Sequence, residues 1–274
     1  MLQKATNPIG IFDSGMGGLT VAKAIAEHLP NENIVYFGDT AHTPWGEKSA
    51  TTIQAYSIKI CELLLQQNCK VILIACHTAS AAAYEHVSDY VGNKAPVMNV
   101  IDPIIQHIQQ HHANKKIGLI GTKQTVRSNT YKKRIEQLNK NISFSALATP
   151  LLVPLIEEGF SEKNVSEMII QEYLSHPELA NIEALILGCT HYPLLRSHIQ
   201  SFYQDTIDIM DASEMTAKVL KEHLTDNNLL NPSNSMQQAV KKTFYVSEHS
   251  EFFANTAKLF FPGDIELKHY PLWD

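Results

Sequence analysis

Two short segments hold side chains that could move protons. An apolar run at residues 71–74 leads to Cys76 and His77, and a second run at residues 184–187 leads to Cys189. Short apolar runs that end at a turn are typical of buried parallel strands, and open α/β sheets bind ligands beyond the carboxyl ends of such strands. The sequence therefore predicts one thiol at a strand end in each half of the chain. Such a pair suits a reaction in which one group removes a proton and the other delivers one.

The surroundings of these two cysteines favour reactive thiols. A free thiol has a pKa of about 8.5, which a helix N-terminus or a nearby cation lowers. We expect a helix to start after each segment, and His77 and His191 lie within two positions of the cysteines. By contrast, Cys61 and Cys69 fit small buried apolar side chains.

Asp13 and Ser14 follow another apolar run and precede a group of glycines. Glycines let a backbone approach a ligand closely, and the helix that we expect next favours an anion at its N-terminus. The spacing does not match the dinucleotide-binding pattern GxGxxG. The alternative is that Asp13 is a simple helix N-cap.

Two further segments combine apolar and functional residues. Pro44 and Gly46 indicate a turn that could display Trp45 to a ligand, with packing of Trp45 on the core as the alternative. An apolar stretch at residues 152–156 runs into Glu157, whose carboxylate would have a raised pKa if it were partly desolvated. Taken alone, the pattern favours a solvated acid at a helix end.

Strands and helices alternate along the chain. Predicted strands comprise residues 9–12, 34–37, 71–74, 97–100, 117–120, 142–147, 184–187, 243–246 and 265–267. Predicted helices comprise residues 19–29, 51–65, 79–91, 124–138, 166–174, 194–203, 213–223 and 251–259. This alternation predicts parallel sheets, and the order strand, cysteine, Thr/His, helix occurs once in each half, as an internal pseudo-twofold would produce. The polar segment 225–238 is predicted to be a surface loop.

The bulk properties restrict the class of protein. The chain has 274 residues, within the range of roughly 250–300 where single cores split into domains. Its net charge of −6 disfavours nucleic acid and anionic membranes as partners. Residues 1–8 are polar, unlike a signal peptide, and no apolar stretch approaches the ~20 residues of a membrane span. We therefore expect a cytoplasmic protein with reduced cysteines, and the absence of a CxxC pair disfavours a redox motif or zinc knuckle.

Five motifs resemble, in chain order, those of the glutamate racemases in the cofactor-independent aspartate/glutamate racemase superfamily. They are Asp13-Ser14-Gly15, Gly38-Asp39-Thr40, Cys76 with Thr78-Ala79-Ser80, residues 154–159, and Gly188-Cys189-Thr190-His191-Tyr192-Pro193. The resemblance spans about residues 8–211. It implies two pseudo-symmetric parallel-sheet α/β domains that face each other across an active-site cleft. Residues 1–98 plus 208–274 would form the first domain and residues 99–207 the second, in a protein that is often a homodimer.

The resemblance also implies interconversion of L- and D-glutamate without pyridoxal phosphate, metal or any other cofactor. Cys76 and Cys189 would flank the α-carbon, one as thiolate base and the other as thiol acid. Asp13 would assist Cys76, whereas Glu157 and His191 would assist Cys189. The implied substrate-binding residues are Asp13, Ser14, Trp45, Gly46, His77, Thr78, Thr122, Thr190 and His191. The product D-glutamate would supply peptidoglycan precursor synthesis.

Two positions depart from the family pattern. His77 stands where the family usually has asparagine, and Trp45 stands where the family usually has tyrosine. Tryptophan keeps an aromatic wall but lacks the hydroxyl, whereas histidine adds a group that can become cationic near neutral pH. We therefore hypothesise that His77 contacts the substrate and shifts the pH optimum or the amino-acid preference.

Other functions remain open from the residues alone. A racemase of the same superfamily could act on another amino acid, such as aspartate. Cys76, His77, Cys189 and His191 could instead form a Cys₂His₂ zinc site, although their spacing is non-standard. A cysteine hydrolase would need a base and an orienting group but no second thiol, and a non-catalytic binding protein could keep the same fold.

Overall fold

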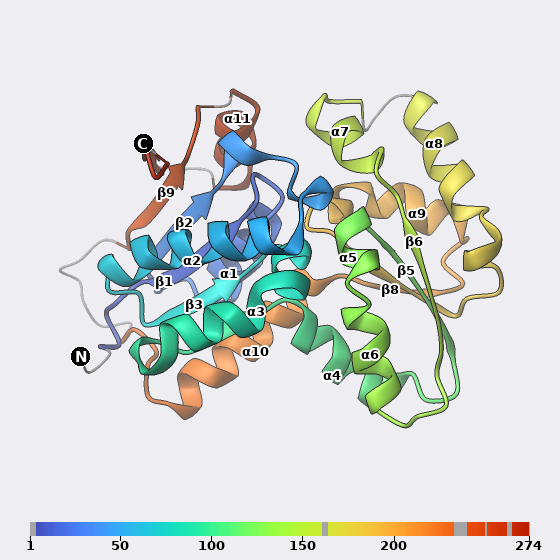
Figure 1. The fold of residues 1–274 in the computed structure, drawn as a ribbon, viewed down its shortest axis with the longest axis horizontal. Helices are drawn as coiled ribbons and strands as arrows, with labels where there is room; N and C mark the ends of the chain where they lie inside the picture. The colour runs from blue at the N-terminus through green and yellow to red at the C-terminus, as the bar shows by residue number, and fades with distance from the viewer. Residues whose placement is uncertain (1–3, 161–163, 233–239, 250, 262–264, 274) are drawn as a thin grey trace.

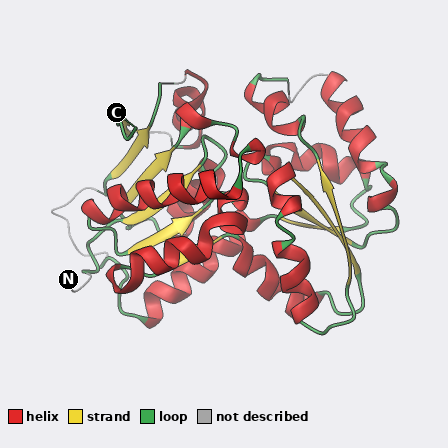
Figure 2. Cartoon of the chain, viewed as in Figure 1, coloured by secondary structure: helices red, strands yellow, loops and turns green. Residues whose placement is uncertain are grey.

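The structure, a computed structural model, describes residues 4–160, 164–232, 240–249, 251–261 and 265–273. Two lobes lie side by side, and each contains a β-sheet flanked by helices (Figure 2). All strand pairs among these residues are parallel. In the part of the chain that is described, no helix combines the length and apolar composition needed to cross a bilayer.

The first lobe holds a six-stranded sheet in the order β10-β9-β2-β1-β3-β4. Its strands are β1 (Ile9–Asp13), β2 (Ile34–Gly38), β3 (Val71–Ile74), β4 (Val97–Asn99), β9 (Lys242–Val246) and β10 (Glu266–His269). The second lobe holds a four-stranded sheet in the order β6-β5-β7-β8. Its strands are β5 (Lys116–Gly121), β6 (Ser143–Ala148), β7 (Ala184–Gly188) and β8 (Asp208–Met210).

The two sheets share a strand order. In each lobe the first strand along the chain lies between the second and third, and the fourth pairs with the third. β3 and β7, which precede the two cysteine segments, therefore occupy corresponding positions. This repeat confirms the predicted fold class of two related parallel-sheet α/β units. β8 pairs with β7, so the second sheet continues past the predicted limit at residue 207, and the division into domains remains a proposal.

Helices cover both sheets and connect the lobes (Figure 1). They are α1 (Leu19–His28), α2 (Ala50–Gln66), α3 (His77–Val91), α4 (Ile101–His111), α5 (Lys123–Arg127), α6 (Thr130–Gln137), α7 (Leu152–Glu157), α8 (Asn164–Leu174), α9 (Arg196–Phe202), α10 (Ala212–Asp226) and α11 (Glu251–Phe260). The chain passes from β4 to β5 through α4 and leaves the second sheet through α10. These two segments join the lobes.

Several helices differ from the sequence prediction. The helix predicted at 124–138 is two helices, because Asn129 adopts a left-handed conformation with φ 55° between α5 and α6. α4 was not predicted; it begins directly after a strand, where the Asn99 side chain accepts hydrogen bonds from the first backbone N–H groups. α10 continues to Asp226, into the predicted loop 225–238, of which residues 233–238 lie outside the described residues.

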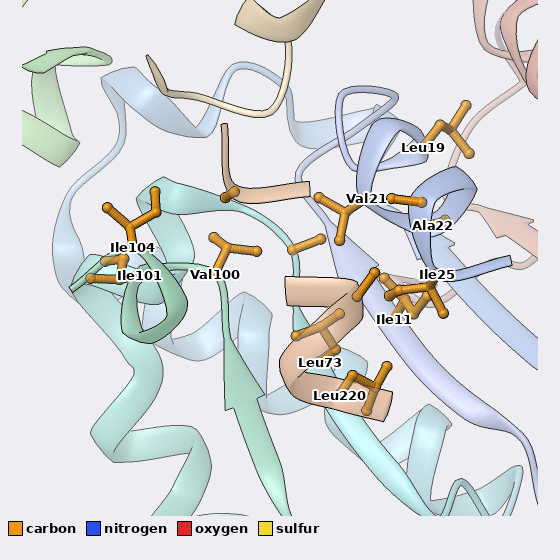
Figure 3. Close-up of a cluster of buried hydrophobic side chains, with 14 of the residues drawn as sticks. Ile11, Leu19, Val21, Ala22, Ile25, Leu73, Val100, Ile101, Ile104 and Leu220 are labelled. Atoms are coloured by element: carbon orange, nitrogen blue, oxygen red, sulfur yellow. The ribbon is translucent and has the colours of Figure 1, made fainter. Parts of the chain in front are cut away.

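A shared hydrophobic core fixes the strands relative to the helices. Ile11 of β1 and Leu73 of β3 are fully buried against Ile25 of α1 and Leu220 of α10 (Figure 3). Val100 and the first residues of α4 belong to the same cluster, which continues to the strands of the second lobe. Burying one such side chain contributes about 1.5–3 kcal/mol. The core therefore holds the carboxyl ends of β1, β3, β5 and β7 in fixed positions.

Candidate active site

One cavity is lined by residues from both lobes. Its lining comprises Ser14, Thr43, Pro44, Trp45, Gly46, Cys76, His77, Thr78, Thr122, Val153, Glu157, Cys189, Thr190 and His191. Every site residue expected from the sequence lines this cavity except Asp13, which is fully buried beside it. The structure thus gathers side chains that are more than a hundred positions apart in the sequence.

Cys76 follows β3 and caps the N-terminus of α3. Its Sγ accepts a hydrogen bond from the backbone N–H of Ala79 at 3.5 Å, and its thiol donates to Ser14 Oγ at 3.7 Å. Burial raises the pKa of Cys76 to about 12, and the nearby Asp13 carboxylate acts in the same direction. In the absence of substrate, Cys76 is therefore a neutral thiol near pH 7.

Asp13 is held beneath Cys76 at the end of β1. Its carboxylate accepts hydrogen bonds from Gly15 N at 2.9 Å and from Thr190 Oγ1 at 3.3 Å. Burial raises the pKa of Asp13. The simple N-cap alternative is wrong, because α1 begins at Leu19 with Gly18 in the capping position. Asp13 instead joins the turn after β1 to the second lobe.

Cys189 follows β7 and has a different partner. Its Sγ lies 3.7 Å from His191 Nδ1, and His191 Nε2 lies 2.9 Å from Glu157 Oε1. Burial lowers the pKa of His191, but the hydrogen bonds to Cys189 and Glu157 outweigh burial and raise the pKa to about 10. The ring is therefore an imidazolium at neutral pH, with the Glu157 carboxylate behind it.

The helix predicted at residues 194–203, after the Cys189 segment, is present, but it starts farther from the thiol than expected. A 3₁₀ turn, Tyr192–Leu195, comes first, and α9 begins only at Arg196. Pro193 stands in the first positions of that turn and supplies no backbone N–H. Cys76 is therefore the thiol with an α-helix N-terminus, and Cys189 is the thiol with a cationic neighbour.

Hydroxyl groups connect the lobes across the cavity. Thr78 Oγ1 of α3 lies 2.9 Å from Thr122 Oγ1 and 3.2 Å from Thr125 Oγ1 in the second lobe. Gly46 packs so closely here that a Cβ would lie 2.6 Å from Thr122 Cβ, which explains the glycine at this position. Uncharged hydroxyls can donate to carboxylates and accept from an ammonium group, so this cluster fits a polar substrate.

Trp45 lines the cavity and is also part of the core. It is 1% exposed, and its indole Nε1–H donates to Asp39 Oδ2 at 3.0 Å. Asp39 also accepts from Trp273 Nε1 at 2.9 Å and from Ser247 Oγ at 2.8 Å. The cavity-lining turn is thus tied to the C-terminal segment. The motif Gly38-Asp39-Thr40 marked this position, but the residues alone assigned no role to Asp39 or Trp273.

The structure corrects the hypothesis about His77 in one respect. The ring lines the cavity, but its Nδ1 pairs with the Tyr131 hydroxyl of α6 at 2.8 Å. Burial lowers the pKa of His77 to about 3. The expectation of a cationic group near neutral pH is therefore wrong, because the buried neutral ring stays neutral. Tyr131 was missed, since nothing in its sequence neighbourhood indicates a contact with residue 77.

The geometry also weighs against a zinc site at the thiols. Among the described residues, Cys76, His77, Cys189 and His191 do not bring their ligand atoms together as a metal-binding group. His77 uses Nδ1 for Tyr131, and His191 uses both ring nitrogens for Cys189 and Glu157. These contacts occupy ring nitrogens that a shared ion would need.

Comparison with known proteins agrees with this arrangement. The Asp/Glu/Hydantoin racemase family matches residues 16–217. Glutamate racemases from Geobacter metallireducens and Neisseria meningitidis are 37% and 42% identical over 94% and 88% of this chain, covering 93% and 87% of their own lengths. The crystal structure of glutamate racemase from Francisella tularensis in complex with D-glutamate superposes with a TM-score of 0.88 at 36% identity, covering 98% of this chain and 99% of that one. The chain is an enzyme that belongs to the Asp/Glu/hydantoin racemase family.

Proposed function

We propose that this enzyme interconverts L- and D-glutamate by proton transfer between its two cavity thiols and the α-carbon. The observation that carries the proposal is the placement of Cys76 and Cys189 after corresponding strands of the two lobes, both lining one cavity. Inversion requires that a proton leave one face of the α-carbon and another arrive on the opposite face. Two thiols on opposite sides of one ligand meet this requirement.

The two thiols begin the reaction with different neighbours. The His191 imidazolium next to Cys189 stabilises the thiolate form of that residue, whereas the Cys76 thiol retains its proton. In one direction, the Cys189 thiolate takes the α-proton, and the C–H electron pair remains on carbon. Cys76 then donates its proton to the opposite face. In the other direction, Cys76 serves as the base and Cys189 as the acid.

The surrounding residues favour the charged species formed during transfer. The N-terminus of α3 and the N–H of Ala79 stabilise a Cys76 thiolate, and His191 with Glu157 performs this role for Cys189. Asp13, which faces the Cys76 side, would balance the substrate ammonium group. Preorganised groups of this kind lower the barrier because they need no reorganisation when charge develops.

We assign substrate binding to the polar lining of the cavity. Ser14, Thr78, Thr122 and Thr190 supply hydroxyls for the two carboxylates and the ammonium group, and the Trp45-Gly46 turn supplies backbone groups. Asp13 and His191 border the same space, and the neutral His77 ring shapes its wall. No cofactor enters the proposed reaction, because the protons, the base and the acid all come from side chains.

We also propose a cytoplasmic homodimer that supplies D-glutamate for peptidoglycan precursor synthesis. The relatives carry the name glutamate racemase. The net charge of −6 does not favour nucleic acid or an anionic membrane as a partner. Residues 1–98 plus 208–274 and residues 99–207 remain the proposed division into domains.

A substrate panel with cysteine variants tests the proposal. L- and D-glutamate and L- and D-aspartate are each incubated with the wild type, Cys76→Ser and Cys189→Ser, and racemisation is followed by circular dichroism. We expect the wild type to racemise glutamate and each variant to lose about 10²–10⁴-fold in rate. Cys61→Ser is the matched control, because Cys61 is a buried thiol outside the cavity. Aspartate turnover without glutamate turnover would contradict the substrate assignment, and an active cysteine variant would contradict the mechanism.

A further inference from the structure

A second cluster of ionisable side chains lies outside the cavity. His107 and His112 come from the C-terminal end of α4 and the residue after it, and Asp208 is the first residue of β8. One ligand atom from each of the three lies within 4.8 Å of the others. Among the described residues, this is the group that meets the geometric requirement for a shared metal ion.

The distances between the ligand atoms fit a tetrahedral shell. His112 Nε2 lies 3.0 Å and His107 Nε2 3.5 Å from Asp208 Oδ2. Zinc binds imidazole nitrogen and carboxylate oxygen at about 2.0–2.2 Å, so neighbouring ligand atoms in a tetrahedron are separated by roughly 3.3 Å. The two observed values lie on either side of this separation. Small side-chain adjustments would therefore admit the ion.

The exposure of the three side chains also fits a site with an open position. The His112 side chain is 2% exposed, whereas His107 and Asp208 are 30% and 46% exposed. The buried ring supplies a fixed ligand, and the other two leave access from solvent. His111, four positions after His107 on the helix, has its ring centroid 4.6 Å from that of His107. Two histidines at this spacing lie on one helical face, as in helical zinc motifs.

We propose that His107, His112 and Asp208 form a binding site for a divalent transition-metal ion of the zinc type. Two imidazoles and a carboxylate favour Zn²⁺, Co²⁺ or Ni²⁺ over Mg²⁺ and Ca²⁺, which prefer all-oxygen ligands. Water, or His111 after a rotation of its side chain, completes the coordination. The ion would cross-link the end of α4 to β8, the last strand of the second sheet; both elements are labelled in Figure 1.

This site is separate from the proposed reaction centre. Asp208 pairs with Ala184 at the amino end of β7, whereas Cys189 follows the carboxyl end of that strand. Five steps along extended chain from Ala184 to Cys189 correspond to roughly 16 Å. The expected effect of the ion is therefore on stability rather than on proton transfer.

Metal binding to untagged protein in the Cys76→Ser/Cys189→Ser background tests the proposal without competition from the cavity thiols. After chelator treatment, calorimetry with Zn²⁺ should show one site per chain, and Co²⁺ should give the intense visible bands of tetrahedral coordination. Zn²⁺ should also raise the unfolding temperature, because it binds the folded state. His107→Gln and Asp208→Asn, which alter partly exposed side chains, should each weaken binding about tenfold or more.

His86→Gln is the matched control, since His86 is an exposed histidine on α3 and should leave Zn²⁺ affinity unchanged. His112→Gln removes the third ligand. If this substitution of a buried side chain lowers stability, the binding data for His107→Gln and Asp208→Asn decide the result. Absence of saturable Zn²⁺ binding would overturn the proposal. Equal affinity in the control, His107→Gln and Asp208→Asn would overturn it as well, because the ion would then bind elsewhere.

Discussion

The Cys76 and Cys189 halves of the cavity share a topology but differ in electrostatics. Each thiol follows the strand that comes third in chain order within its sheet. Cys76 faces a buried carboxylate and a helix N-terminus, and its pKa is raised to about 12. Cys189 faces His191, whose pKa is raised to about 10 by its contacts with Cys189 and Glu157. The two sheets therefore share a strand order, but the chemical environments of the two thiols differ.

In the proposed reaction, this difference means that the two thiols start from different electrostatic surroundings. A pair of identical thiols would have no preferred base, whereas here the cation lies next to only one of them. The substrate ammonium group can supply the missing positive charge on the Cys76 side, where Asp13 is the neighbouring acid. We infer that the protein supplies the positive charge next to Cys189, whereas the bound substrate supplies it next to Cys76.

Removing the His191 imidazolium should have the largest effect on the reaction rate. His191→Asn replaces the imidazolium by a neutral side chain, so the Cys189 thiolate loses its stabilising charge. We expect kcat/KM to fall about 100-fold or more in both directions. Stopped-time measurements from L- and from D-glutamate check this value. Retention of wild-type rates would show that Cys189 does not depend on the neighbouring charge.

Glu157→Gln should change the pH dependence of kcat/KM. The carboxylate raises the pKa of His191, so its loss lowers that pKa and the imidazolium disappears at lower pH. We expect the alkaline limb of kcat/KM to shift to lower pH by roughly one unit, which corresponds to a loss of about twofold at pH 9 and about fivefold at pH 10. Glu158→Gln, at an exposed neighbour, is the control. Identical profiles for the two variants would contradict the role of Glu157.

Trp45→Phe should have a smaller effect, which concerns stability and substrate binding. It removes the indole N–H that donates to buried Asp39 but keeps an aromatic wall. Loss of one donor to a buried carboxylate costs about 1–3 kcal/mol in the free energy of unfolding. We expect KM for glutamate to rise a few-fold with kcat nearly unchanged, as steady-state kinetics and denaturant titration can show. A large loss of kcat would instead assign Trp45 to the chemical step.

His77→Asn should produce the smallest change in pH dependence. Burial lowers the pKa of His77 to about 3, so the ring carries no charge change between pH 5 and 9. The pH–rate profiles of wild type and variant should therefore superimpose, while the loss of the Tyr131 contact changes the relative rates on glutamate and aspartate. A displaced profile would contradict the neutral state, and unchanged amino-acid preference would remove the proposed role in specificity.

The sequence predicted the strands more reliably than the helices between them. Buried parallel strands such as Val71–Ile74 and Ala184–Gly188 are continuous apolar runs, which stand out without knowledge of the fold. The break between α5 and α6 was not visible, because the apolar spacing continues through Asn129. α4 was missed because it starts without a separating loop and has a proline in its first turn.

The site residues were predictable as a set, but their electrostatic states were not. Motifs placed Cys76, Cys189 and their polar neighbours at strand ends, and the structure brings these residues to one cavity. The imidazolium state of His191 depends on a contact with Glu157, 34 positions away. The neutral state of His77 depends on its burial beside Tyr131. Such properties arise from tertiary packing, which residue types and local spacing do not encode.

The most direct test of the two-thiol account is racemisation of L-glutamate in D₂O, followed at early times by NMR or mass spectrometry. One thiol removes the α-proton, and a different thiol, exchanged with solvent, delivers the new one. The account predicts that D-glutamate carries deuterium at the α-carbon while the remaining L-glutamate stays largely unlabelled. Equal early labelling of both enantiomers would contradict it, because a single base would then serve both faces.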